Sequence, residues 1–169
     1  MTVSDRLPDD VTIEDAETAD IDTLADLWVD LASDQRRHGS HLRSKGNRSR
    51  IRETIVQHVI TETVLVARWN ESIVGFVTFG RETGHFRQDV IRGLIHNLYV
   101  RQSDRRCGIG SSLLAAAEES LARDVDVIAL ESMAKNDAAL DFYRHFGYTS
   151  HRIELEKPIN SDPVTTNDG

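Results

Sequence analysis

A glycine-bearing turn between an apolar strand and an apolar helix constrains this chain more than any other feature. The strand pattern is centred on residues 94–100, and Gly108 and Gly110 open the helix that follows. The first N–H groups of a helix lack intrahelical partners and lie at the positive end of its dipole, so they attract an anion. Glycine leaves room for a ligand to approach this backbone. The turn therefore predicts a phosphate-binding site.

The charge of this turn opposes the charge of the whole chain. The 169 residues include 20 Lys and Arg against 28 Asp and Glu, and the net charge of -8 disfavours nonspecific binding to nucleic acid or anionic membranes. Within residues 101–110, three arginines and one aspartate give a net +2. A Walker A loop needs G-K-[ST], and a dinucleotide fingerprint needs glycine where Leu113 stands. Neither motif fits, and a turn that only reverses the chain remains the alternative.

The other hydrophobic patterns alternate between strands and helices. We expect strands at 11–14, 63–68, 73–80, 94–100, 125–133 and 149–156. Four helices are expected: one starts after Asp20, a second ends near Thr61, and two more span 109–121 and 137–146. This order predicts an α/β sandwich with a mixed central sheet. One domain is expected at 11–157, with an N-terminal tail at 1–10 and a flexible C-terminal tail at 158–169.

The location of the protein is expected to be cytoplasmic, with an acidic surface. Cys107, the single cysteine of the sequence, cannot form an internal disulfide, and residues 1–10 lack an apolar stretch of signal-peptide length. The longest strand-like apolar run, 73–79, is far shorter than the roughly 20 residues that cross a bilayer. These features predict neither membrane nor nucleic-acid partners.

A second motif lies after the fifth expected strand. It is Asn136-x-x-Ala139-x-x-Phe142-Tyr143-x-x-x-Gly147-Tyr148, in which Asn136 and Tyr143 are two helical turns apart and share a face. With Arg105-x-x-Gly108-x-Gly110, it resembles the GCN5-related N-acetyltransferase (GNAT) superfamily, whose motifs are [RQ]-x-x-G-x-[GA] and N-x-x-A-x-x-F-Y-x-x-x-G-[FY]. The resemblance covers about residues 11–157 and implies a sheet splayed between its fourth and fifth strands.

The resemblance implies acetyl-CoA as co-substrate. The pantetheine arm would pair with the backbone of Leu98 and Val100 and contact Asn136, which could also cap its helix. Tyr143 would lie beside the thioester. The residues implied to hold the pyrophosphate are Arg105, Arg106, Cys107, Gly108, Ile109, Gly110 and Ser111. Cys107 more simply fills a loop position, because direct transfer to an amine needs no cysteine.

The resemblance also implies catalytic roles. Tyr143 would protonate the departing thiolate, unless its ring only packs beside Phe142. An amine with a pKa near 10.4 is neutral in roughly one molecule in 2,500 at pH 7, so a base is useful. Both His96 and Glu131 occupy positions where branches of the family carry a catalytic carboxylate. The sequence does not separate them, and either could be an ordinary strand residue.

The expected activity is transfer of an acetyl group to a primary amine of a small molecule. A protein N-terminal or lysine acetyltransferase is the first alternative, and a non-catalytic acyl-CoA-binding sensor is the second. In the family, the segment that holds His38, His41 and Arg43 overhangs the acceptor site, so these residues could contact the acceptor. Two histidines without other ligands do not predict a metal site. Members are often dimers, which leaves a homodimer open.

Overall fold

The computed structural model describes residues 6–159 and contains one mixed sheet. Its strands follow chain order: β1 (Val11–Asp15), β2 (Val64–Trp69), β3 (Ser72–Arg81), β4 (Arg92–Val100) and β5 (Val127–Leu130). Strands β1 to β4 pair antiparallel, whereas β4 and β5 are parallel. The expected α/β fold with a mixed sheet is confirmed.

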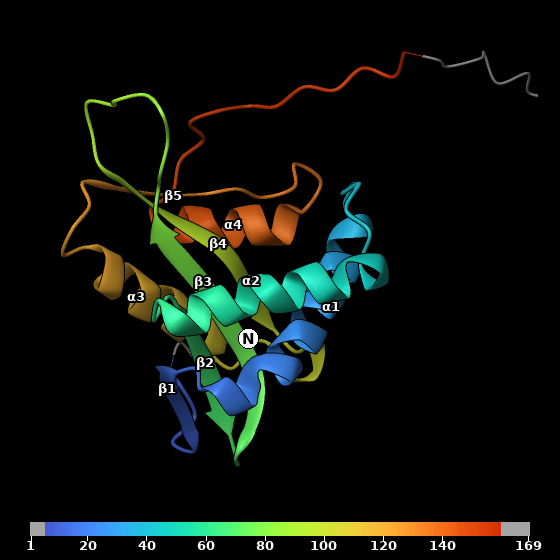
Figure 1. Ribbon diagram of the computed structural model, residues 1–169, viewed down its shortest axis with the longest axis vertical. Coiled ribbons are helices and arrows are strands. Elements are labelled where there is room, and N and C mark those ends of the chain that lie inside the picture. The colour runs from blue at the N-terminus through green and yellow to red at the C-terminus, as the bar shows by residue number, and fades with distance from the viewer. Residues whose placement is uncertain (1–5, 160–169) are drawn as a thin grey trace, which may run out of the picture.

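Helices cover both faces of the sheet (Figure 1). They are α1 (Ile21–Arg36), α2 (Arg48–Ile60), α3 (Ile109–Leu121) and α4 (Asp137–His145), and short 3-10 turns precede the first three. Helices α1 and α2 bury Leu24 and Ile55 against Val64 and Phe76, while α3 buries Leu113 against the opposite face. Residues 73–79 of β3 are buried throughout because helices cover this strand on both sides.

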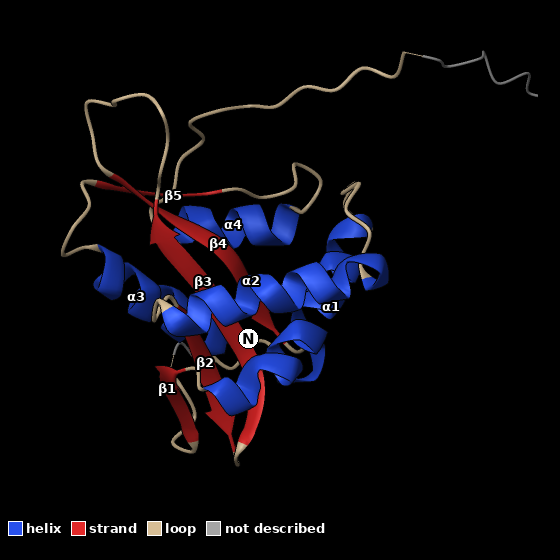
Figure 2. Ribbon diagram, in the orientation of Figure 1, coloured by secondary structure: helices blue, strands red, loops and turns tan. Residues whose placement is uncertain are grey.

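The sheet opens between β4 and β5 (Figure 2). The two strands pair only from Arg92–Val127 to Ile95–Leu130, although β4 continues to Val100. At the point of divergence, the β3–β4 register skips one residue, so that Thr78 faces Asn97 and Phe79 faces Ile95. His96 is the extra residue of this bulge, which locally interrupts the ladder between β3 and β4. The expected splay between the fourth and fifth strands is therefore present.

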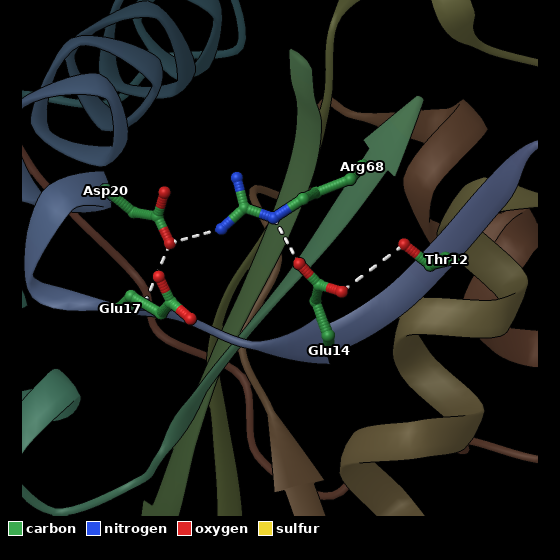
Figure 3. A network of polar contacts seen from close by, with 5 residues as sticks. All are labelled: Thr12, Glu14, Glu17, Asp20 and Arg68. Carbon is green, nitrogen blue, oxygen red and sulfur yellow. Dashed lines mark hydrogen bonds and ion pairs between the residues drawn. The ribbon is translucent and has the colours of Figure 1, made fainter. Parts of the chain in front are cut away.

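An ion-pair network joins the first elements of the chain (Figure 3). Arg68 on β2 donates to Glu14 on β1 and to Asp20. The Asp20 carboxylate also accepts the Glu17 N–H at 2.8 Å, and only 9% of its side chain is exposed. Asp20 is the N-cap residue of α1 but makes no side-chain capping bond to that helix. Its carboxylate is instead oriented by Arg68.

Two expected strands differ from the structure. The fifth spans Val127–Leu130 rather than 125–133, because β4 diverges after Ile95, and Glu131 therefore lies just beyond it. The strand expected at 149–156 is absent from the described residues. This segment is exposed and runs away from the helices and sheet (Figure 1), because its alternating pattern finds no strand to pair with. Of the two expected tails, residues 1–5 and 160–169 lie outside the described part.

No helix within residues 6–159 is long and apolar enough to cross a membrane.

Candidate active site

A cleft of about 460 Å³ lies where β4 and β5 separate. The C-terminal end of α1, the second half of β4, the turn before α3, the segment after β5 and one face of α4 line it. These elements come from three regions of the sequence, 31–38, 95–110 and 130–143, and the divergence of the two strands leaves space between them. The residues predicted from sequence that line the cleft are His96, Leu98, Val100, Arg105, Arg106, Ile109, Gly110, Glu131, Asn136 and Tyr143.

A second hollow, of about 280 Å³, continues along the glycine turn. It shares Arg106 and Gly110 with the cleft and adds Gly108 and Ser111. Phe142 and His145 of α4 and Phe146 directly after it form its other wall. Cys107 lines neither space, and its Sγ lies 3.6 Å from the carbonyl oxygen of Arg105. The structure thus brings all the predicted turn residues together except the cysteine side chain.

The backbone of the turn presents unpaired donors. Gly108 is the N-cap of α3 and has φ +77°, in the left-handed region that favours glycine. The first intrahelical bond runs from the Ser112 N–H to the Gly108 carbonyl at 3.0 Å. The N–H groups of Ile109, Gly110 and Ser111 therefore have no helical partner. A Cβ on Gly110 would meet Val100 only at 3.7 Å, so the position of this glycine is less restrictive than that of Gly108.

The side chain of Arg105, although exposed, is fixed by contacts with the rest of the protein. Its Nε donates to the Val100 carbonyl at 2.9 Å, and its Nη2 donates to Asp34 at 3.1 Å. The guanidinium also lies 5.5 Å from the centre of the Tyr99 ring. Asp34 comes from α1, and no sequence motif identified it as part of the site. Arg106 has a positive φ of 66° and makes no such brace among the described residues, which leaves its charge available to a ligand.

The backbone of β4 faces the gap at alternate residues. The Arg101 N–H donates to the Val74 carbonyl on β3 at 2.8 Å, and backbone groups alternate sides along a strand. Asn97 and Tyr99 consequently direct their backbone toward β3, whereas Leu98 and Val100 direct theirs toward the cleft. The Val100 carbonyl already accepts a hydrogen bond from Arg105. Leu98 is therefore the residue of this edge that offers a ligand both its N–H and its C=O. This is an edge to which an extended ligand can bind.

His96 lies beside a second histidine that sequence reasoning missed. The rings of His96 and of His58 on α2 have centroids 5.7 Å apart. The Nδ1 of His58 lies 2.7 Å from the Thr63 Oγ1, which restrains the ring. Burial lowers the pKa of both imidazoles, and a positive charge on His96 would lower the pKa of His58 further. Both rings are thus neutral, and able to accept a proton, near pH 7.

Glu131 lines the same cleft from the segment after β5, and its side chain is exposed. It is not on the strand where it was expected, but the short segment Leu130–Met133 carries it into the opening. The cleft therefore holds both candidates for a base, one from each side of the gap between β4 and β5. The geometry does not choose between them.

Tyr143 is held by an aromatic cluster on α4. Its ring lies 5.3 Å from that of Phe142 and 6.0 Å from that of Tyr148, both edge-on. Burial raises the pKa of the Tyr143 hydroxyl, so it stays protonated and can donate. Asn136, two turns earlier, accepts the Ala139 N–H at 3.2 Å and caps α4. The capping role considered from the sequence is therefore present.

The connection between α1 and α2 reaches the site through one of its three predicted residues. His38 lines the cleft, together with Gln35 and Arg37. His41 instead lies 3.0 Å from Glu156, and Arg43 is not among the lining residues. Within residues 6–159, no three His, Cys, Asp or Glu side chains are grouped so that they could hold a metal ion.

Comparison with known families finds one matching model. The acetyltransferase (GNAT) family model matches residues 22–148, which begin within α1 and extend past the end of α4. A comparison with curated protein sequences finds no match.

Solved structures share the fold at low sequence identity. A GCN5-related N-acetyltransferase from Ralstonia eutropha is 21% identical over 88% of this chain and 98% of its own, with a TM-score of 0.70. Aminoglycoside N-acetyltransferase AAC(6')-Iy, in complex with CoA, is 11% identical over 89% and 95% of the two chains, with a TM-score of 0.69. Arabidopsis thaliana Naa50, in complex with the bisubstrate analogue CoA-Ac-MVNAL, is 20% identical over 91% and 93%, with a TM-score of 0.64.

Proposed function

Because the chain belongs to the acetyltransferase (GNAT) family, we propose that it transfers an acetyl group from acetyl-CoA to a primary amine of a small molecule by direct attack. The observation that carries the proposal is the single cleft at the splay. It joins a turn of unpaired N–H groups, a free strand edge, a protonated tyrosine and two candidate bases. Acetyl-CoA, when bound, supplies the acetyl group as a thioester.

The residues present fit the diphosphate of this co-substrate. The N–H groups of Ile109, Gly110 and Ser111 point out of the N-terminus of α3, and Arg106 adds a full positive charge beside them. The Arg105 guanidinium is held by the Val100 carbonyl and by Asp34. We assign it the role of fixing the turn, and Arg106 the role of pairing with phosphate.

The free edge of β4 would orient the rest of the molecule. Leu98 would pair with the amides of the pantetheine arm and aim its N–H at the thioester carbonyl, where negative charge develops during attack. Asn136 and Tyr143 approach from α4 on the other side of the cleft. The Tyr143 hydroxyl, which burial keeps protonated, would donate its proton to the thiolate as it leaves.

His96 is our first choice for the base. Its burial-lowered pKa keeps the imidazole neutral at pH 7, where it can take a proton from the ammonium of the acceptor directly or through a water. Glu131 is the competing candidate. In a series with His96→Gln and Glu131→Gln, the variant that lacks the base should lose the acidic limb of the kcat/KM profile, while the other keeps it. If both keep the limb, neither residue is the base.

The acceptor class is tested by thiol release from acetyl-CoA with a panel of amines, polyamines, amino acids and peptides. We expect turnover with small primary amines. The fold alone permits other acceptors, since it is shared by an aminoglycoside acetyltransferase and by a protein bound to a peptide-bearing analogue. Transfer to peptides alone would favour the protein N-terminal or lysine alternative. Tight CoA binding without turnover on any acceptor would overturn the catalytic proposal and favour a sensor.

A further inference from the structure

One histidine lies on the core-facing side of α2. His58 follows the buried Ile51 and Ile55 at intervals of seven and three residues, so the three side chains share one face of the helix. The His58 ring lies 5.7 Å from the ring of His96 on β4, measured between the two centroids. His96 lines the cleft, whereas His58 does not. His58 can therefore act on the chemistry of the cleft only through His96.

A chain of hydroxyl groups fixes the position of the proton on the His58 ring. The Thr61 Oγ1 donates its proton to the Gln57 carbonyl at 2.8 Å, because a carbonyl oxygen can only accept. The Thr61 and Thr63 Oγ1 atoms lie 2.8 Å apart, so the proton of this second contact comes from Thr63. The Thr63 Oγ1 has then donated its only proton and must accept from the His58 Nδ1 at 2.7 Å. Neutral His58 is therefore the Nδ1–H tautomer.

The other ring nitrogen of His58 is an acceptor. In the Nδ1–H tautomer, the Nε2 carries a lone pair and no proton. A ring of His96 that holds an N–H on its near side can donate to this lone pair, directly or through one water. His58 thus has one nitrogen committed to Thr63 and one available to His96.

The charges around the pair favour a single proton on it. Burial is the main cause that lowers the pKa of His58, the charge of His96 lowers it further, and the Thr63 backbone acts in the opposite direction. Burial also lowers the pKa of His96. Within the described residues, the carboxylates Glu53 and Glu62 and the arginines of α2, β3 and β4 shift the pKa of neither ring. Once His96 has taken a proton, His58 therefore stays neutral and remains an acceptor.

We propose that His58 is the positioning residue of His96 and accepts an N–H of that ring at its Nε2. One nitrogen of His96 then carries the proton of this bond, and the other keeps its lone pair for the acceptor ammonium. When the ammonium gives a proton to His96, its N–H bond breaks, a new N–H bond forms on the ring, and the positive charge moves to the imidazolium. The bond to His58 becomes stronger as its donor becomes charged, and water later takes the proton. The inference rests on the proposed function, in which His96 is the base.

Nuclear magnetic resonance of the isotope-labelled full-length protein tests the pair without any turnover. His58 should show the Nδ1–H tautomer near neutral pH. In His58→Phe the pKa of His96 should fall by about 0.5–1 unit, because a hydrogen bond of ordinary strength favours the protonated ring by that much. His58→Gln, whose amide oxygen can take the place of the Nε2, should restore part of this shift. The matched control is His151→Phe, at an exposed histidine, and it should leave the titration of His96 unchanged.

The pH profile of kcat/KM tests the role of His58 in the reaction. His58→Phe should lower the plateau of kcat/KM about 10- to 100-fold, which is part of the roughly 10²- to 10⁴-fold that a general base contributes. It should also move the acidic limb to lower pH by the same amount as the pKa of His96. His58→Gln should recover part of both effects, and His151→Phe should change neither. Circular dichroism checks that the three variants fold.

The outcomes separate this inference from the proposed function. An Nε2–H tautomer for His58 in the unmodified protein would overturn the pairing, even if His58→Phe did not fold or the protein acetylated no acceptor. A His96 pKa that His58→Phe leaves unchanged would also overturn it. A shifted His96 pKa with an unmoved acidic limb would overturn the positioning role, because another group such as Glu131 is then the base. Absence of turnover on every acceptor would instead overturn the proposed function and the positioning role with it, while the tautomer and the titration still decide the pairing.

Discussion

Replacing Arg68 with methionine removes the cation that neutralises the buried Asp20 carboxylate while keeping an apolar stem of similar length. Only 9% of the Asp20 side chain and 21% of the Arg68 side chain are exposed. Removing one partner of a buried ion pair costs about 3–5 kcal/mol, because the other charge is left without compensation. Asp20 keeps the Glu17 N–H, and Glu14 is exposed enough to regain water, so the lower end applies.

We therefore expect Arg68→Met to reduce the free energy of unfolding by about 3 kcal/mol. For a chain of this length, such a loss lowers Tm by about 6–12 °C. Urea denaturation monitored by circular dichroism measures it, with Arg48→Met as the matched control. Arg48 also pairs with an aspartate, Asp26 at 2.9 Å, but it is 42% exposed, and exposed pairs contribute only about 0–1 kcal/mol.

A double-substitution cycle separates the ion pair from lost packing. Asp20→Asn removes the buried charge, so combining it with Arg68→Met should cost less than the sum of the two single losses, by about 1–3 kcal/mol. If Arg68→Met loses no more stability than Arg48→Met, or if the two substitutions at Asp20 and Arg68 are additive, the pair does not hold β1, β2 and the start of α1 together as argued.

Three further results are expected. Tyr143→Phe should lower kcat about 10²- to 10⁴-fold in the thiol-release assay, and full turnover at saturating acetyl-CoA would contradict its role as acid. The free energy of unfolding should fall as the pH drops below about 6.5, because burial depresses the folded-state pKa of His58 and His96 and the unfolded chain binds those protons first. His96→Gln should flatten this pH dependence. Urea titrations that give the same free energy of unfolding at every pH would refute it. Gly108→Ala should lower the free energy of unfolding by about 1–2 kcal/mol, because the residue has a φ of +77°. Gly46→Ala, with open space around the glycine, should introduce no such strain. Equal urea midpoints for the two variants would show that the turn relaxes to accept alanine.

The elements with their own periodic pattern were predicted well. The glycine turn and the helix after it depend on neighbouring residues, and the structure contains both. The strand at 149–156 was predicted from the same kind of local pattern and is absent from the described chain. Alternation of apolar and polar residues shows which side chains a strand would bury, but a strand also needs a neighbouring strand with which its backbone can form hydrogen bonds. The pattern at Ile153 and Leu155 carries no information about that partner.

Local sequence patterns did not predict which residues contact the site residues in space. His58 approaches His96 from α2, and Asp34 holds Arg105 from α1, although both lie far from their partners in the sequence. The bulge that makes His96 an extra residue depends on the β3–β4 register. The end of β5 before Glu131 likewise depends on where β4 turns away. None of these contacts has a local signature.

The sequence by itself determined the class of fold, the glycine turn before α3 and the family, since periodicity, glycine positions and the spacing of Asn136 and Tyr143 are properties of short segments. Only the tertiary structure decided which groups share one cleft, which arginine is committed to the protein, and which strand edge is left open. Those outcomes depend on how distant segments pack and on which hydrogen bonds the packing satisfies. Such packing depends on contacts between segments that are distant in the sequence, so no single segment determines it.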